Sequence, residues 1–252
     1  MLKKIFVALV VLLVVVAGAG WYLLSSLDSI AKNAIEKFGS QVTGTSVSVD
    51  NVRLLPFNGA GTVSGLMVGN PAGFATPHAL TLDQLSVTLD MNSLLGSGPI
   101  VIKEIDIVAP HVTYEVGGGG SNLQTLERNA RAYTADAADA PATAGAQPQR
   151  KLIIEDLYVR DGQVDVSATV LQGHALSAPL PEIHLSDIGA DSGGATPGEV
   201  AQEVVGAISK NGVRVGAGAL AHFATSAVTG VAHGVTGGAT GVGKGLKGLF
   251  GN

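Results

Sequence analysis

The chain has 252 residues, of which 46% are hydrophobic and 14% charged, with 35 glycines, no cysteine and a net charge of -5. The lack of cysteine excludes disulfides, thiol catalysis, iron–sulfur clusters and cysteine-ligated zinc. The negative charge and an aromatic content of 4% argue against a nucleic-acid partner, which would require a basic face and stacking aromatic side chains.

The N-terminus has the pattern of a membrane anchor. Residues 1–4 end in two lysines, and residues 5–24 contain no charged residue. About 20 apolar residues suffice for a helix that crosses a bilayer. The lysines predict a single-pass protein with residues 1–4 in the cytoplasm and the bulk of the chain outside. Ala17-Gly18-Ala19 also fits a signal-peptidase site, so a cleaved signal peptide is the alternative.

The hydrophobic pattern then changes from a helical to a strand period. Apolar residues recur every three or four positions from Leu27 to Phe38, which predicts a helix that ends at Gly39. From Val47 onward apolar and polar residues alternate, most clearly between Leu85 and Met91. The other candidate strands cover residues 60–68, 100–108, 112–116, 152–159, 164–170 and 183–185. Short segments with Gly, Pro or Asn separate them, which predicts hairpins in an antiparallel sheet.

An internal repeat supports this sheet. Residues 102–114 align without a gap on residues 154–166, and residues 49–54 resemble the first half of the same unit. Each full unit consists of a predicted strand, a turn at Pro110 or Gly162, and a second strand. Strand pairs that each expose an apolar face must stack to bury it. The fold expected is therefore mainly β, with an elongated, curved, groove-like antiparallel sheet and a few short helices.

Residues 1–133 resemble the AsmA-like proteins of Gram-negative envelopes. The resemblance rests on the order of the elements and on one motif, which consists of Gly69, Asn70, Pro71, Ala72, Gly73 and Phe74. It implies an inner-membrane-anchored periplasmic protein that is related to bridge-like lipid-transfer proteins and linked to outer-membrane biogenesis. The chain is short for this family, so one copy is not expected to span a periplasm.

The composition divides the rest of the chain into segments. Residues 25–133 form the first part of the β domain and end in a short helix that Ser121 caps. Residues 134–150 are rich in Ala, Asp and Pro, which predicts a flexible linker. Residues 151–211 contain the second repeat unit and a helix that begins with the capping box Thr196-Pro197-Gly198-Glu199.

Residues 212–252 form a glycine-rich basic tail without Asp or Glu. Small residues every four positions favour close approach to a membrane, to envelope protein partners or to a second copy of the chain. The low helix propensity of glycine instead predicts a tail that is disordered in isolation. Residues 238–245 match a phosphate-binding loop up to the lysine, but Gly245 stands where Ser or Thr must hold magnesium, so nucleotide binding is not expected.

The sequence contains no catalytic constellation. The six histidines lack metal-ligand spacing, and carboxylate pairs such as Glu104 with Asp106 are typical of an exposed strand face. We therefore expect no enzyme activity, no metal site and no cofactor.

Two functions from different classes remain open. The first is envelope maintenance through phospholipid binding in an apolar β groove. Its candidate lining residues are apolar and lie on or beside predicted strands: Leu85, Val87, Leu89, Met91, Ile100, Ile102, Val112, Tyr114, Val164 and Val166. The second is a non-catalytic structural or interaction protein at the membrane, in which the same face is a sealed core. An apolar strand face has the same sequence pattern in both cases.

Overall fold

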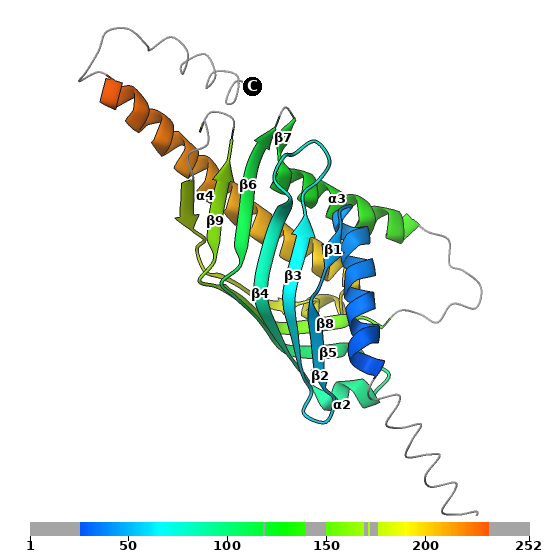
Figure 1. The fold of residues 1–252 in the computed structure, drawn as a ribbon. Coiled ribbons are helices and arrows are strands. Elements are labelled where there is room, and N and C mark those ends of the chain that lie inside the picture. The colour runs from blue at the N-terminus through cyan, green and yellow to red at the C-terminus, as the bar shows by residue number, and fades with distance from the viewer. Residues whose placement is uncertain (1–25, 118, 140–149, 169–170, 172–175, 232–252) are drawn as a thin grey trace, which may run out of the picture.

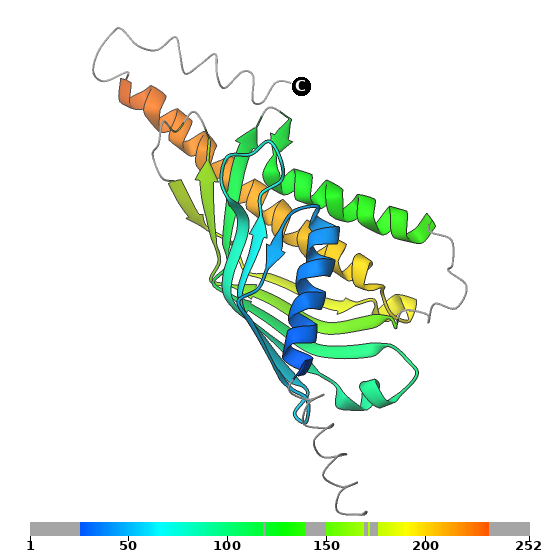
Figure 2. The same ribbon diagram turned by 45° about the vertical axis from the view of Figure 1, so that its right-hand side comes forward.

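The structure is a computed structural model that describes residues 26–117, 119–139, 150–168, 171 and 176–231. In this part of the chain eleven strands form a curled, half-barrel sheet, and the long helices lie on its inner side (Figures 1 and 2). This confirms a mainly β fold. Residues 1–4 and the expected membrane span 5–24 lie outside the described residues. Among the residues that are described, no helix is long and apolar enough to cross a membrane.

Most of the strands are halves of longer, bent strands. Both β5 and β6 pair antiparallel with β4, and the register continues from Leu85↔Ile107 across the bend to Leu80↔Val112. The strands β8 and β9, and the strands β11 and β10, continue one another in the same way. The bounds are β1 (Val47–Ser48), β2 (Asn51–Leu55), β3 (Ala60–Gly69), β4 (His78–Leu89), β5 (Ile100–Val108), β6 (His111–Gly117), β7 (Gly120–Ser121), β8 (Leu152–Arg160), β9 (Gln163–Ser167), β10 (Leu176–Pro179) and β11 (Ile183–Ile188).

The two repeat units lie side by side and parallel, so the sheet is mixed. Strand β5 pairs with β8, and β6 with β9, in the register of the sequence alignment, as in Ile102↔Ile154 and Val112↔Val164. The prediction of a purely antiparallel sheet is therefore wrong where β5 meets β8 and where β6 meets β9. Parallel neighbours require a long crossover connection, and the connection from β7 to β8 contains the helix α3 (Asn122–Asp139).

The bend occurs at equivalent positions of the two repeat units. Ala109 and Asp161 have φ angles of 52° and 55°, and each precedes a buried residue, Pro110 or Gly162. The left-handed backbone turns each strand without interrupting the ladder, because Ala109 N donates to Arg160 O at 2.8 Å and Gln163 N to Pro110 O at 2.9 Å. We call β6, β9 and β10 the β6 arm, and β5, β8 and β11 the β5 arm.

Three long helices lie on the concave side of the sheet: residues 26–43, α3 and α4 (Pro197–Val231). The capping box predicted for α4 is present, since Thr196 N donates to Glu199 Oε2 at 2.7 Å and Glu199 N to Thr196 Oγ1 at 3.2 Å. The expectation of only short helices is wrong, because α4 has 35 residues. Two short helices also occur in the described residues, α2 (Met91–Leu95) and the 3-10 helix η2 (Ala190–Ser192).

Two segment boundaries also differ from the prediction. Helix α3 extends to Asp139, so the first six residues of the expected linker are helical, and residues 140–149 lie outside the described residues. Helix α4 passes through the expected start of the tail at Gly212 and continues to Val231. The tail beyond residue 231, which includes the partial phosphate-loop motif of residues 238–245, lies outside the described residues.

The glycines of α4 explain why this segment is helical. A Cβ atom on Gly212 would lie 2.7 Å from Leu123 Cδ1, and a Cβ atom on Gly216 would overlap the ring of Tyr114. Only glycine allows the helix to approach β6 and α3 this closely. The contacts offset the roughly 1 kcal/mol that each glycine costs in a helix.

Candidate functional site

Four of the ten predicted lining residues belong to a sealed core. Val112 and Val164 are 0% exposed, and Tyr114 and Val166 are 8% and 7% exposed. They lie on the β6 arm and pack in one cluster with residues of α4, including Leu220. In this structure α4 covers these four residues, so they do not line an open groove.

The other six predicted lining residues are half-buried: Leu85, Val87, Leu89, Met91, Ile100 and Ile102. Strand alternation places Leu85, Val87 and Leu89 on one face of β4. The register places Ile105 opposite Val87 and Ile102 opposite Leu89. We call Leu85, Val87, Leu89, Ile102 and Ile105 the apolar strip.

The apolar strip lies between two covered regions of the same sheet face. On one side, the helix of residues 26–43 packs Ala31 and Ile35 over Val49, Val52 and Val63. On the other side, β8 has the fully covered residues Ile154, Leu157 and Val159, each 1% exposed. Leu85 contacts both clusters, whereas Val87 and Leu89 belong to neither. The strip is therefore the part of this face that remains partly open.

The motif of residues 69–74 forms the loop between β3 and β4, and its role in the structure is to hold this end of the sheet together. A Cβ atom on Gly69 would collide with Ser46, and Gly73 has a φ of 95°. Pro71 is buried, and the ring of Phe74 lies 3.0 Å from where a Cβ atom of Gly117 would be. Asn70 begins a buried polar network that the sequence did not indicate.

This network joins the loop to β6 and α3 through Glu115 and Asn122. Asn70 Nδ2 donates to Glu115 Oε2 at 2.9 Å, and Asn122 Nδ2 donates to Asn70 Oδ1 at 2.9 Å and to Thr113 O at 2.8 Å. Glu115 N in turn donates to Asn122 Oδ1 at 2.9 Å. Asn122 is 0% exposed and all of its amide atoms are used.

The carboxylate of Glu115 is the charged centre of the network. Burial by itself raises its pKa, but donors from Ala75 N, Thr76 N, Thr76 Oγ1 and Asn70 Nδ2 stabilise the ionised form, and the pKa is lowered overall. Glu115 is 7% exposed, and both of its carboxylate oxygens accept hydrogen bonds from within the protein. The network is structural.

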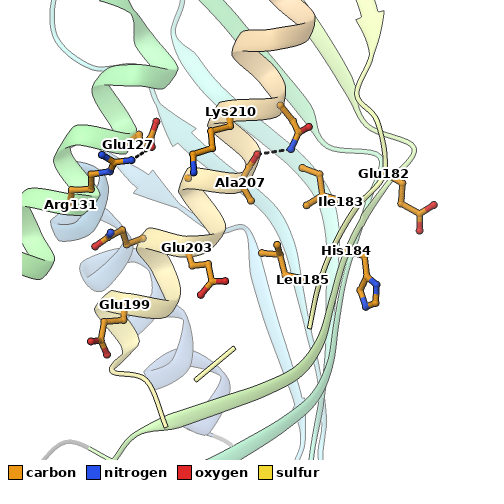
Figure 3. Close-up of a pocket in the computed structure, with 13 residues that line it drawn as sticks. Glu127, Arg131, Glu182, Ile183, His184, Leu185, Glu199, Glu203, Ala207 and Lys210 are labelled. Carbon is orange, nitrogen blue, oxygen red and sulfur yellow. Dashed lines mark hydrogen bonds and ion pairs between the residues drawn. The ribbon is translucent and has the colours of Figure 1, made fainter. Parts of the chain in front are cut away.

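A polar cleft of about 700 Å³ lies between α3, α4 and β11 (Figure 3). Ile183 and Leu185 point toward α4, whereas Glu182 and His184 point to the other side of β11. Several of its charged groups already have partners: Glu199 caps α4, Glu127 pairs with Arg131, and Glu182 pairs with Arg160. Across the residues that the structure describes, no group of three His, Asp or Glu side chains could hold a metal ion.

The carboxylates of the repeat units lie on the outer face of the β5 arm, as their spacing predicted. Arg160 pairs with Asp106 at 3.3 Å and lies 4.1 Å from the ring centroid of Tyr158. His184 stacks on Tyr158 at 4.3 Å and contacts Asp156 at 2.7 Å. Arg160, His184 and Asp156 are 40%, 47% and 41% exposed, as is typical of surface ion pairs, whereas Asp106 is 21% exposed.

Comparison of the chain with models of protein families and with curated proteins finds no match. The AsmA-like resemblance therefore stays a prediction.

Proposed function

We propose that this protein is an inner-membrane-anchored, periplasmic, AsmA-like protein that contributes to envelope maintenance by holding phospholipid acyl chains on the apolar strip. The observation that supports the proposal most is the partial exposure of Leu85, Val87, Leu89, Ile102 and Ile105 between two covered parts of the same sheet face. A hydrocarbon chain laid along the strip would bury the area that remains exposed.

The chemistry of the strip suits an acyl chain better than a polar ligand. Its five members are aliphatic, and strand alternation directs the polar residues Ser86 and Thr88 to the opposite face. Burial of apolar surface contributes about 25 cal/mol per Å² and needs no directional contact. Such a surface accepts chains of different length and saturation.

A second candidate function is a structural or interaction protein with a sealed core. The observation that favours it is the complete burial of Val112 and Val164 beneath α4, together with the satisfied network around Glu115 and Asn122. In this alternative the strip is merely the margin of the core. The two functions differ in whether lipid contacts Val87.

Photo-crosslinking from the strip in the intact chain tests the choice. A photoreactive amino acid at Val87 should capture phospholipid in living cells, whereas the same group at Thr88, which is exposed on the opposite face of β4, should not. Equal lipid capture at both positions, or none at Val87, would contradict the proposal and support the structural alternative.

The expected topology has its own test. Alkaline phosphatase fused after Asn252 should be active, because the lysines at positions 3 and 4 predict a cytoplasmic N-terminus followed by one span. If a reporter that works only in the cytoplasm is active when fused at the same position, the periplasmic location is contradicted.

A further inference from the structure

Exposed apolar side chains gather at the end of the molecule where the helix of residues 26–43 begins. Phe57 is 86% exposed, Leu95 89%, Ile30 58% and Leu55 48%. Large apolar side chains exposed to this extent are costly in water, and a group of them marks an interaction surface. We call Leu55, Phe57 and Leu95 the apolar tip.

Two short segments form the apolar tip, and they pack on each other. Phe57 lies in the turn between β2 and β3, and Leu95 ends α2. Leu89 N donates to Gly59 O at 2.6 Å, and a Cβ atom on Gly59 would lie 3.0 Å from Met91 Cγ. Both views place this turn and α2 together at one end of the sheet (Figures 1 and 2).

The chain enters the fold next to the tip. Leu54 N, one residue before the tip begins, donates to Asp28 Oδ1 at 2.8 Å. Asp28 is only four residues beyond Leu24, where the uncharged run of residues 5–24 ends. If that run is the membrane anchor, the bilayer surface lies within a few residues of Leu55 and Phe57.

The two segments also have the composition of a surface that meets a bilayer. Residues 54–60 and residues 91–99 contain no Asp, Glu, Lys or Arg, and the guanidinium of Arg150, which lies beside α2, donates to Ser93 O, Leu94 O and Gly98 O. Apolar and aromatic side chains can enter the boundary between head groups and acyl chains, where a charged side chain would resist transfer.

We propose that Phe57 and Leu95 insert into the outer leaflet of the membrane in which the chain is anchored, and so dock this end of the sheet on the bilayer. The proposal rests on the membrane anchoring proposed above. Docking would bring Leu89, which adjoins α2 through Asp90 and Met91, to the lipid surface. A phospholipid chain could then reach the apolar strip from the membrane without crossing water.

The absence of cysteine allows a direct test in the full chain, because an introduced cysteine is the only thiol. The variants Phe57→Cys and Leu95→Cys receive a nitroxide spin label and are inserted into vesicles of phosphatidylethanolamine and phosphatidylglycerol. Val108→Cys is the matched control, because Val108 is also apolar and 42% exposed but lies at the bend of the sheet. Collisions with oxygen and with a water-soluble nickel chelate report the depth of each label.

Docking predicts that labels at positions 57 and 95 become several-fold less accessible to the nickel chelate than the label at position 108, and more accessible to oxygen. If the chain enters the vesicles and all three labels are equally accessible to the chelate, the docking proposal is wrong while the anchor stands. If the chain does not enter the vesicles at all, the proposed anchoring fails and docking fails with it.

Discussion

The two copies of the internal repeat are equally buried in their second strands and differ in their first. Val112 and Val164 are opposite each other and both 0% exposed. Ile105 and Leu157 are also opposite each other, yet Leu157 is 1% exposed and Ile105 is half-buried. The sequence pattern is the same in both pairs, so the residues themselves do not decide which positions are sealed.

What covers the sheet decides the difference. Helix α4 contacts β6, β9, β10 and β11, and α3 contacts β6. The helix of residues 26–43 packs over β2 and β3 instead, which leaves the β4 and β5 positions of the apolar strip between the two covers. A repeat that is symmetric in sequence thereby produces one sealed first strand and one that is partly open.

The largest expected loss of stability comes from truncating Leu157, the fully buried partner of Ile105. Leu157→Ala removes a fully buried side chain and should destabilise the protein by about 3 to 4 kcal/mol, whereas Ile105→Ala should cost about 1 to 2 kcal/mol because Ile105 is already partly in contact with solvent. Urea unfolding of the two variants measures the difference. Equal losses would mean that Ile105 is as well covered as Leu157.

The packing of α4 on the β6 arm depends on Gly216. A Cβ atom on Gly216 would overlap the ring of Tyr114, so Gly216→Ala should destabilise the fold by about 2 to 3 kcal/mol. The matched control is Gly218→Ala in the same helix, where a Cβ atom meets nothing within 4 Å and the change should stabilise by about 0.5 to 1 kcal/mol. Opposite signs in thermal unfolding would confirm that α4 rests on β6, and equal signs would contradict it.

The loop of the motif depends on Asn122. Asn122→Ala leaves Glu115 N, Thr113 O and Asn70 Oδ1 without the partners that they have now, and should cost about 2 kcal/mol. Amide hydrogen exchange should also become faster at residues 70–76. A variant as stable as the parent would show that the network carries little of the stability at this end of the sheet.

The smallest effect expected is the pH dependence that Glu115 adds. Its pKa is lower in the folded chain than in the unfolded chain, so its contribution is present above the unfolded value and is lost as the pH falls through the folded one. Glu115→Gln should therefore be less stable than the parent at pH 7. The difference between their free energies of unfolding should become smaller on acidification below about pH 4.5. Urea unfolding at several pH values measures this difference. A difference that stays constant with pH would mean that Glu115 is not ionised in the folded protein.

Much of the fold follows from local sequence patterns. Alternation locates most strands to within a few residues. The gapless repeat contains the register of the parallel strands, although the turn residues predict antiparallel pairing. The antiparallel prediction fails there because the connection between the two repeat units contains α3 and is a crossover, whereas a hairpin needs only a short turn. The capping box at Thr196 set the start of α4 correctly, because a cap is a local interaction.

The features that the sequence could not predict are those that depend on distant partners. Gly212 and Gly216 are poor helix formers until Leu123 and Tyr114 lie against them. Asn70 and Glu115 are unremarkable polar residues until the fold brings their side chains within 2.9 Å. For the same reason the sequence placed Val87 and Val164 together among the lining residues, and only the position of α4 separates them.

One substitution made at two positions tests the central claim most directly. Val87→Asp places a carboxylate on the half-open strip, where water can hydrate it in the lipid-free protein, whereas Val164→Asp places it in a core that is 0% exposed. The measurements are the phospholipid recovered with the purified full chain and its melting temperature. We predict that Val87→Asp loses the lipid and keeps a near-normal melting temperature, while Val164→Asp unfolds. Unfolding of both variants, or retained lipid in Val87→Asp, would contradict the account.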